Sequence, residues 1–413
     1  MTDPTASSLA QAGPSDGRRL GRIFLFVFVP LMALFLSSAR TDLPYHIDAA
    51  TNVFTAWTIG TTGSPVLGAY EELAAPSFKG VFAWIVPSER GPVSQYPPGA
   101  ALLAAPLYTV WPDAQNVLLV ADNAEESVQV TVPIPDLRPV AFVASATTAA
   151  ALGLLALTAL ELGMSARAAV TTGLVGGLAT SAWTVAADQF WQHGPNMFWV
   201  ALGMWLAVRG RWGWAGAAFG ALAITRPPVV LIGAALGVLL LAQRDVRSAI
   251  RLAAGVTPGV VALLAYNAWL LGSPSVSGAY GGEFASRATE VEPVRYLSNV
   301  GSAFFDPLYG LFVWSPFVAL LVLAVITMVR KVPPWAVASA LGGLAYLLLQ
   351  LKLNRASGGA GFSYYRYPLE TLVATGPILA LAGREAWKTG TLWRAALVGT
   401  TAFSIIVHAM AAW

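Results

Sequence analysis

Long apolar stretches with almost no charge recur along this chain, and they restrict its fold more than any other feature. The hydrocarbon core of a bilayer is about 30 Å thick, so a helix needs about 20 predominantly apolar residues to cross it. Of the 413 residues, 56% are hydrophobic and only 11% are charged, whereas a soluble protein carries about 25% charged residues. We therefore expect an all-α, polytopic transmembrane helix bundle.

The first apolar run covers roughly 21–38 and follows Arg18, Arg19 and Arg22. Its length of about 18 residues exceeds the usual 7–15 residues of a signal-peptide core. We interpret it as a retained membrane helix, and a signal peptide cleaved after Ser37–Ser38–Ala39 is the alternative.

Ten further runs bring the expected number of transmembrane helices to about eleven. They lie near 139–161, 169–187, 195–209, 212–225, 228–243, 250–271, 306–329, 334–351, 368–386 and 393–412. The two that meet at Thr225–Arg226–Pro227–Pro228 have a second interpretation as one broken helix. The run Ala100–Val110 is too short to cross a bilayer.

Basic residues fall at alternate turns between these runs, which is the pattern of cytoplasmic loops. With a cytoplasmic N-terminus, the cytoplasmic residues are Arg167, Arg209, Arg211, Arg244, Arg247, Arg251, Arg330, Lys331, Arg384, Lys388 and Arg394. The expected protein has a disordered tail over 1–20 and one membrane domain over 21–413. Its outward segments are a long first loop, 40–137, and two shorter ones, 272–305 and 352–367.

Two acids follow the first helix directly, Asp42 and Asp48. A carboxylate near the membrane surface is partly desolvated, which raises its basicity and suits a general base. The alternative is that both acids are solvated and cap the start of a helix. Asp48 precedes a predicted interfacial helix over Ala49–Trp57, where the helix dipole favours an acid, and Asp42 has no such explanation.

Five aromatic and histidine side chains are candidates for a substrate pocket because they stand in or beside the outward loops: Tyr45, His46, Tyr96, His193 and Tyr365. A divalent metal held by His46, His193 and acids is conceivable. No ligand spacing supports it, so we expect neither a metal nor another cofactor. The remaining histidine, His408, falls in the last apolar run and is interpreted as a satisfied residue or one at the lipid boundary.

Four basic residues stand on the side where positive charge is disfavoured, namely Arg226, Lys352, Arg355 and Arg366. A charge at membrane depth costs roughly 2.5–3.5 kcal/mol on insertion scales. Either outward acids such as Glu283, Glu290 or Glu370 compensate them, or they hold an anionic ligand. Arginine binds phosphate bidentately, and lysine binds it as a point charge.

Several short motifs together resemble the GT-C superfamily of membrane glycosyltransferases, especially the bacterial branches related to protein O-mannosyltransferases and lipid-linked aminoarabinose or arabinose transferases. The matching pieces are Asp42–His46, Tyr96–Gly99, Trp191–Pro195, Thr225–Pro227, Tyr266–Asn267 with Gly272–Pro274, Gly310–Pro316, and Gly358–Gly359 through Tyr365–Pro368. The richness in Ala, Gly and Trp is typical of a high-GC, actinobacterial source.

The resemblance implies a glycosyltransferase of the bacterial plasma membrane with an extracytoplasmic active site. Such an enzyme moves a hexose or pentose from a polyprenyl-phosphate donor to an envelope glycan, lipid or protein, without nucleic acid. In the superfamily a carboxylate in the first outward loop is the base, and Asp42 matches it. Arg226 and Arg366 match pieces that bind the lipid phosphate, whereas Lys352 and Arg355 are added from charge placement alone.

The alternative function is a transporter or flippase for a lipid-linked or anionic substrate. Transporters usually carry ionisable residues near the middle of the membrane and show inverted repeats. The expected spans of this chain are nearly free of charge in their interiors, which favours the glycosyltransferase.

Overall fold

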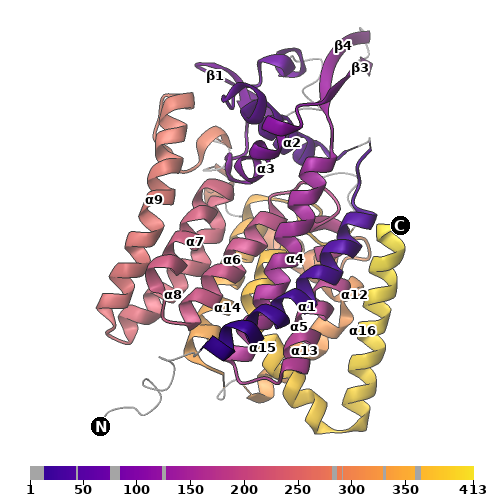
Figure 1. The fold of residues 1–413 in the computed structure, drawn as a ribbon, viewed down its shortest axis with the longest axis vertical. Coiled ribbons are helices and arrows are strands. Elements are labelled where there is room, and N and C mark those ends of the chain that lie inside the picture. The colour runs from indigo at the N-terminus through magenta and orange to yellow at the C-terminus, as the bar shows by residue number, and fades with distance from the viewer. Residues whose placement is uncertain are drawn as a thin grey trace.

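Long helices form one bundle, and a smaller layer of helices and hairpins covers one end of it (Figure 1). The computed structural model describes residues 14–42, 45–74, 84–122, 127–280, 286–290, 292–328, 332–358 and 364–413. About three-quarters of the chain is helical, so the protein is nearly all-α. The end of the bundle that carries residues 45–135 is called the capped end below.

The bundle contains the following elements: α1 Pro14–Ser38, α4 Arg138–Glu161, α5 Ala166–Leu178, η3 Ala182–Ala186, α6 His193–Val208, α7 Trp212–Thr225, η4 Pro227–Val230, α8 Leu231–Ala242, α9 Val246–Leu271, α12 Leu311–Trp314, α13 Pro316–Met328, α14 Pro334–Leu353, α15 Pro368–Thr389 and α16 Thr391–Ala412. Between α9 and α12 lie η5 Gly278–Tyr280 and α11 Pro293–Phe305. A helix therefore lies over each of the eleven expected spans.

Five helices in the described part of the chain are long and apolar enough to cross a bilayer: α1, α4, α9, α14 and α16. Many large apolar side chains on the outer helices are exposed, for example Val238 (66%) and Met410 (77%). Exposed apolar surface on this scale suits lipid rather than water. These features confirm a helical membrane protein. The start of α1 at Pro14 shows that residues 14–20 are helical rather than part of the expected disordered tail, and residues 1–13 lie outside the described part.

The cap is built from α2 Ile47–Thr62, η1 Gly68–Ala74, α3 Gly99–Val110 and two antiparallel hairpins. The hairpins pair β1 Ile85–Ser88 with β2 Gly91–Ser94, and β3 Ala114–Asp122 with β4 Ser127–Pro135. Helix α2 confirms the helix expected over Ala49–Trp57, but strands were not expected in this loop. Alternation explains β4, because Val130 and Val132 are buried while Gln129 and Thr131 are exposed.

Glycine contacts fix the directions of several helices. Gly216 of α7 packs on Leu252 of α9, and Gly220 packs on Val256 one turn further along both. Helices α7 and α9 therefore run parallel, and α8 must return between them. Phe219 of α7 also packs on Gly233 of α8, so Arg226–Pro228 joins two antiparallel helices rather than interrupting one.

Candidate functional site

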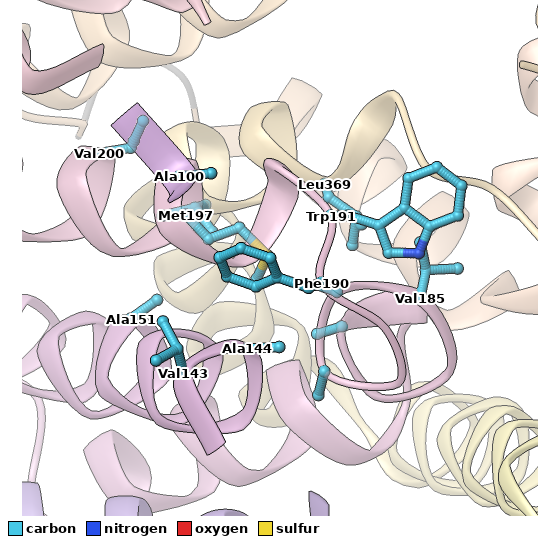
Figure 2. Close-up of a cluster of buried hydrophobic side chains, with 14 of the residues drawn as sticks. Ala100, Val143, Ala144, Ala151, Val185, Phe190, Trp191, Met197, Val200 and Leu369 are labelled. Atoms are coloured by element: carbon cyan, nitrogen blue, oxygen red, sulfur yellow. The ribbon is translucent and has the colours of Figure 1, made fainter. Parts of the chain in front are cut away.

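The irregular segment 188–193, between η3 and α6, runs through the centre of the candidate site and is called the spine below. Pro195 stands in the first turn of α6, where proline costs no hydrogen bond, so α6 begins sharply at His193. Phe190 and Trp191 point in opposite directions, and Phe190 enters the core beside Met197 (Figure 2). The buried Phe190 ring anchors the segment and leaves Trp191 to face the polar side.

The chain that follows α1 lies along this spine. The backbone N–H of Arg40 donates to the Asp188 carbonyl at 2.9 Å, and that of His46 donates to Gln189 Oε1 at 2.9 Å. The backbone N–H of Phe190 donates to Tyr45 Oη at 2.5 Å. Tyr45 therefore fastens two backbone segments, and the predicted acid-bearing segment is held at Arg40, Tyr45 and His46 against residues 188–190.

Asp48 and Arg366 form a buried ion pair at the capped end. Arg366 Nη1 donates to Asp48 Oδ2 at 2.7 Å, and the two side chains are 5% and 13% exposed. Arg366 also donates to the Gly358 carbonyl and lies over the rings of Trp191 (4.8 Å) and Tyr367 (5.0 Å). These contacts hold its guanidinium in one orientation.

Asp48 stays ionised in this position. Burial raises the pKa of its carboxyl, but Arg366, His46 and a hydrogen bond from Tyr96 lower it by more, so the net pKa lies below its ordinary value. His46 Nδ1 accepts a hydrogen bond from the Asp48 N–H and caps α2. Asp48 itself lies in the first turn of α2, as the sequence predicted. A carboxylate paired in this way is a weak base, because protonation would break the ion pair.

A second buried acid, Glu370 in the first turn of α15, lies beside His193 and Arg226. His193 Nδ1 donates to Glu370 Oε1 at 2.8 Å, and Arg226 Nη1 lies 4.0 Å from the same oxygen. Arg226 Nη1 is also 3.4 Å from His193 Nε2, so the histidine carries its proton on Nδ1. Asn196 Nδ2 donates to Glu370 Oε1 at 3.0 Å.

The two predicted arginines meet at one aromatic ring. The Arg226 guanidinium lies 5.4 Å from the centroid of Tyr367, and that of Arg366 lies 5.0 Å from it. Arg226 comes from the end of α7, where its extended backbone (φ −155°, ψ 91°) turns the chain into η4, and Arg366 comes from the segment before α15. Residues 140 positions apart therefore place two positive charges around a shared phenol.

An apolar cavity of about 360 Å³ adjoins this cluster. Its walls include Pro227 and Leu231 beside Arg226, Tyr96 and Tyr280 beside Asp48, and Leu263 and Leu270 of α9. Tyr96 and Tyr280 meet edge-to-face at 6.2 Å between centroids. The cavity thus joins hydrophobic helix surface to the charged cluster, an arrangement suited to an amphipathic ligand.

Asp42 lies outside the buried cluster and is exposed. Its carboxylate has no hydrogen bond or ion pair among the described residues. It is close enough to Asp188 to affect it electrostatically: burial raises the pKa of Asp188 to about 6, Arg40 opposes the shift, and Asp42 adds to it. Asp42 and Asp188 therefore form a second acidic group, separate from the Asp48–Arg366 pair.

Two comparisons with known proteins found no match. No protein-family model matches the chain, and no curated protein matches it significantly. The roles of the residues therefore rest on their geometry. Within the described ranges no three His, Asp or Glu side chains converge as a metal site requires.

Besides Asp42 and Tyr45, three predicted site residues do not join the cluster. Lys352 donates to the Glu290 carbonyl, and Arg355 is exposed. Tyr365 faces the other way, where its Oη lies 2.7 Å from Ser315 Oγ. His408 lies 3.4 Å from the same Ser315 Oγ and 3.1 Å from Thr184 Oγ1, which confirms it as a satisfied buried residue.

Sequence reasoning missed the aromatic members of the cluster and the full role of its second acid. Trp191 and Tyr367 stand inside quoted motifs, beside the histidine and arginine that were selected. Glu370 was considered only as a compensating charge, and it does lie 4.0 Å from Arg226. Of the other two acids considered, Glu290 lies 3.8 Å from Arg295, and Glu283 falls outside the described residues.

Proposed function

We propose that this protein is a GT-C-like glycosyltransferase that uses a polyprenyl-phosphate sugar. The observation that carries the proposal is the pair Arg226 and Arg366, fixed around Tyr367 beside an apolar cavity at the capped end. Two fixed guanidinium groups suit the phosphate of such a donor. The cavity suits the first part of its lipid chain.

The proposed reaction requires a general base for the acceptor hydroxyl and positive charges that stabilise the leaving phosphate. An acceptor hydroxyl attacks the anomeric carbon, the bond from that carbon to the phosphate oxygen breaks, and the polyprenyl phosphate leaves with the electron pair. Asp42 takes the proton from the hydroxyl, because its carboxylate is exposed and has no described partner, whereas Asp48 is engaged by Arg366. Such a base contributes roughly 10²–10⁴ in rate, and the arginines stabilise the departing phosphate.

Asp48 has a different proposed role from the one assigned to Asp42. Its ion pair with Arg366 and its hydrogen bond from Tyr96 orient the guanidinium for the donor phosphate. Glu370 and His193 orient Arg226 in the same way. His46, whose side chain is 25% exposed and whose ring lies 4.6 Å from that of buried Trp191 between centroids, is placed to contact the sugar ring.

The proposal places the capped end on the extracytoplasmic face of the bacterial plasma membrane. Eleven membrane crossings put α1, α5, α7, α9, α14 and α16 in the outward direction, which agrees with the parallel packing of α7 and α9. An envelope glycan, lipid or protein would then reach the site from outside. The described turns that carry expected cytoplasmic basic residues, among them Arg167 and Arg384, lie at the opposite end (Figure 1).

The test is donor binding and transfer by Arg226→Gln and Arg366→Gln, measured separately with a polyprenyl-phosphate sugar and an envelope extract as acceptor source. Both variants should lose at least tenfold in donor affinity. Arg355→Gln is the matched control, because that exposed arginine lies outside the cluster. Wild-type donor affinity in both cluster variants would contradict the proposal.

The alternative, a transporter or flippase, draws support from one observation. Glu370, His193 and Asn196 are fully or almost fully buried inside the bundle, and buried ionisable residues in membrane helices often line transport pathways. The two functions differ in product. The protein is reconstituted into vesicles with a fluorescent lipid-linked sugar. Movement of the sugar between leaflets without formation of a glycosidic bond to any acceptor would favour the transporter.

A further inference from the structure

A hollow of about 860 Å³ lies between α1 and α5 at the end of the bundle opposite the cap. The two helices touch where Gly173 and Gly177 of α5 pack on Val27 and Leu31 of α1, with an added methyl group at either glycine only 2.8 Å from the partner side chain. Below these contacts the helices diverge. The hollow is therefore a wedge that opens toward the N-terminal ends of both helices.

Four arginines surround this wedge: Arg18, Arg19 and Arg22 of α1 and Arg167 of α5. Among the side chains that the structure describes, which exclude those of residues 14–16, none of the four forms an ion pair or a side-chain hydrogen bond. Two other arginines at this end are compensated: Arg209 donates to Glu161 at 2.9 Å, and Arg384 donates to Glu385 at 3.1 Å.

No acid is among the described residues that line the wedge, so the four charges repel one another. Arg18 and Arg22 are one helical turn apart, a spacing at which like charges destabilise a helix. The surface beside them is apolar, because Ile23 forms the floor of the wedge and Phe26 is 68% exposed. Phe26 stands about 6 Å further along α1 than Arg22, toward the middle of the membrane.

We propose that the wedge binds an anionic phospholipid from the leaflet at this end of the bundle. Its phosphate lies among Arg18, Arg22 and Arg167, and an acyl chain lies on Ile23 and Phe26. The combination of charges and apolar floor selects a lipid over free phosphate, which would use the arginines only. The site is separate from the cluster at the capped end and does not depend on the reaction proposed there.

The test uses the absence of cysteine from the chain. A single cysteine at the exposed Thr171, which lines the wedge, carries an environment-sensitive dye in the purified, delipidated protein. Phosphatidylglycerol brominated on its acyl chains should quench the dye, and brominated phosphatidylcholine should not. High salt should weaken the quenching because the headgroup interaction is screened, and inorganic phosphate at equal concentration should not compete.

Arginine variants then test the headgroup contact. The triple change Arg18→Gln, Arg22→Gln and Arg167→Gln should weaken quenching by phosphatidylglycerol at least tenfold. The matched control is Arg211→Gln, Arg247→Gln and Arg251→Gln, three exposed arginines at other turns, which should change it less than twofold. Equal losses in both triple variants, equal quenching by the two lipids, or displacement by phosphate would each overturn the proposal. All six side chains are exposed, so both variants should fold.

Discussion

Asp48 and Arg366 are 318 residues apart in the sequence, and their side chains meet at 2.7 Å in the interior of the capped end. One comes from the first turn of a cap helix and the other from the segment before α15. The pair therefore fastens the cap to the bundle, in addition to any part it has in binding. This double role leads to the first prediction.

Breaking the Asp48–Arg366 pair should destabilise the protein strongly. Asp48→Asn and Arg366→Gln should each lower the free energy of unfolding by about 3 kcal/mol or more, because each leaves a buried charge without its partner. The double variant should lose much less than the sum of the two. Unfolding in detergent, followed by circular dichroism, measures all three.

The exposed pair Glu385–Lys388 is the control for this cycle. It has a similar distance of 3.0 Å, but its side chains are 30% and 63% exposed. Removing either partner should change stability by about 0.2–1 kcal/mol. Strictly additive losses at Asp48 and Arg366 would show that the two side chains do not interact energetically.

The contact between α7 and α9 should tolerate no side chain at its centre. A methyl group added at Gly259 would overlap the carbonyl oxygen of Gly220, and the backbone cannot move away without separating the helices. Gly259→Ala should therefore cost about 1–3 kcal/mol. Gly237→Ala in α8 is the control, because its new methyl group would lie 3.6 Å from the nearest side chain and alanine favours a helix. Equal melting temperatures would contradict the close packing.

The sequence predicted the helices well because apolar runs and basic turns are local signals. It also selected Asp48, His46, Tyr96, His193, Arg226 and Arg366, which the structure brings together. It could not decide which acid pairs with which arginine, because Asp48 and Glu370 meet their partners only through the packing of α2, α6 and α15. The first hairpin was missed for a different reason, since β1 Ile85–Ser88 contains a proline and has only four residues.

Asp188 should make stability fall as the pH rises through the weakly acidic range. Its pKa is raised from 3.8 to about 6, so the unfolded chain loses this proton first and folding is penalised between those two values. Above pH 6 the full penalty of up to about 3 kcal/mol applies. Asp188→Asn should therefore raise the melting temperature at pH 7.5 and leave it nearly unchanged at pH 4.

Asp136 is the control, because its pKa is shifted in the opposite direction to that of Asp188. Its hydrogen bonds with Arg138 hold its pKa below the ordinary value, so its contribution to stability is present at neutral pH and lost in acid. Asp136→Asn should lower the melting temperature at pH 7.5. A parallel response of the two variants to pH would contradict the assigned environment of Asp188.

Labelling of single cysteines in intact cells should distinguish the two ends of the bundle. Single cysteines at Asn116, Ser286 and Arg355, all exposed, should react with an impermeant thiol reagent in intact cells, whereas cysteines at Arg167 and Arg247 should react only after permeabilisation. Ser94 is a poor position for this test, although it belongs to the expected first outward loop, because it is only 5% exposed. Labelling of Arg167 and protection of Asn116 in intact cells would reverse the proposed orientation.

The sharpest prediction concerns the base. Asp42→Asn should abolish sugar transfer and leave donor binding and thermal stability near wild type, because Asp42 is exposed and makes no described contact that holds the fold. Asp48→Asn should instead weaken donor binding and stability together, since it releases Arg366. Asp188→Asn tests whether Asp188 is the base instead. If Asp188 is only a neighbour of the base, the variant should still transfer sugar, and the acidic side of its pH–rate profile should shift. If transfer survives in Asp42→Asn and disappears in Asp188→Asn, the base is Asp188 rather than Asp42. The Asp188 pKa of about 6 also suits a base.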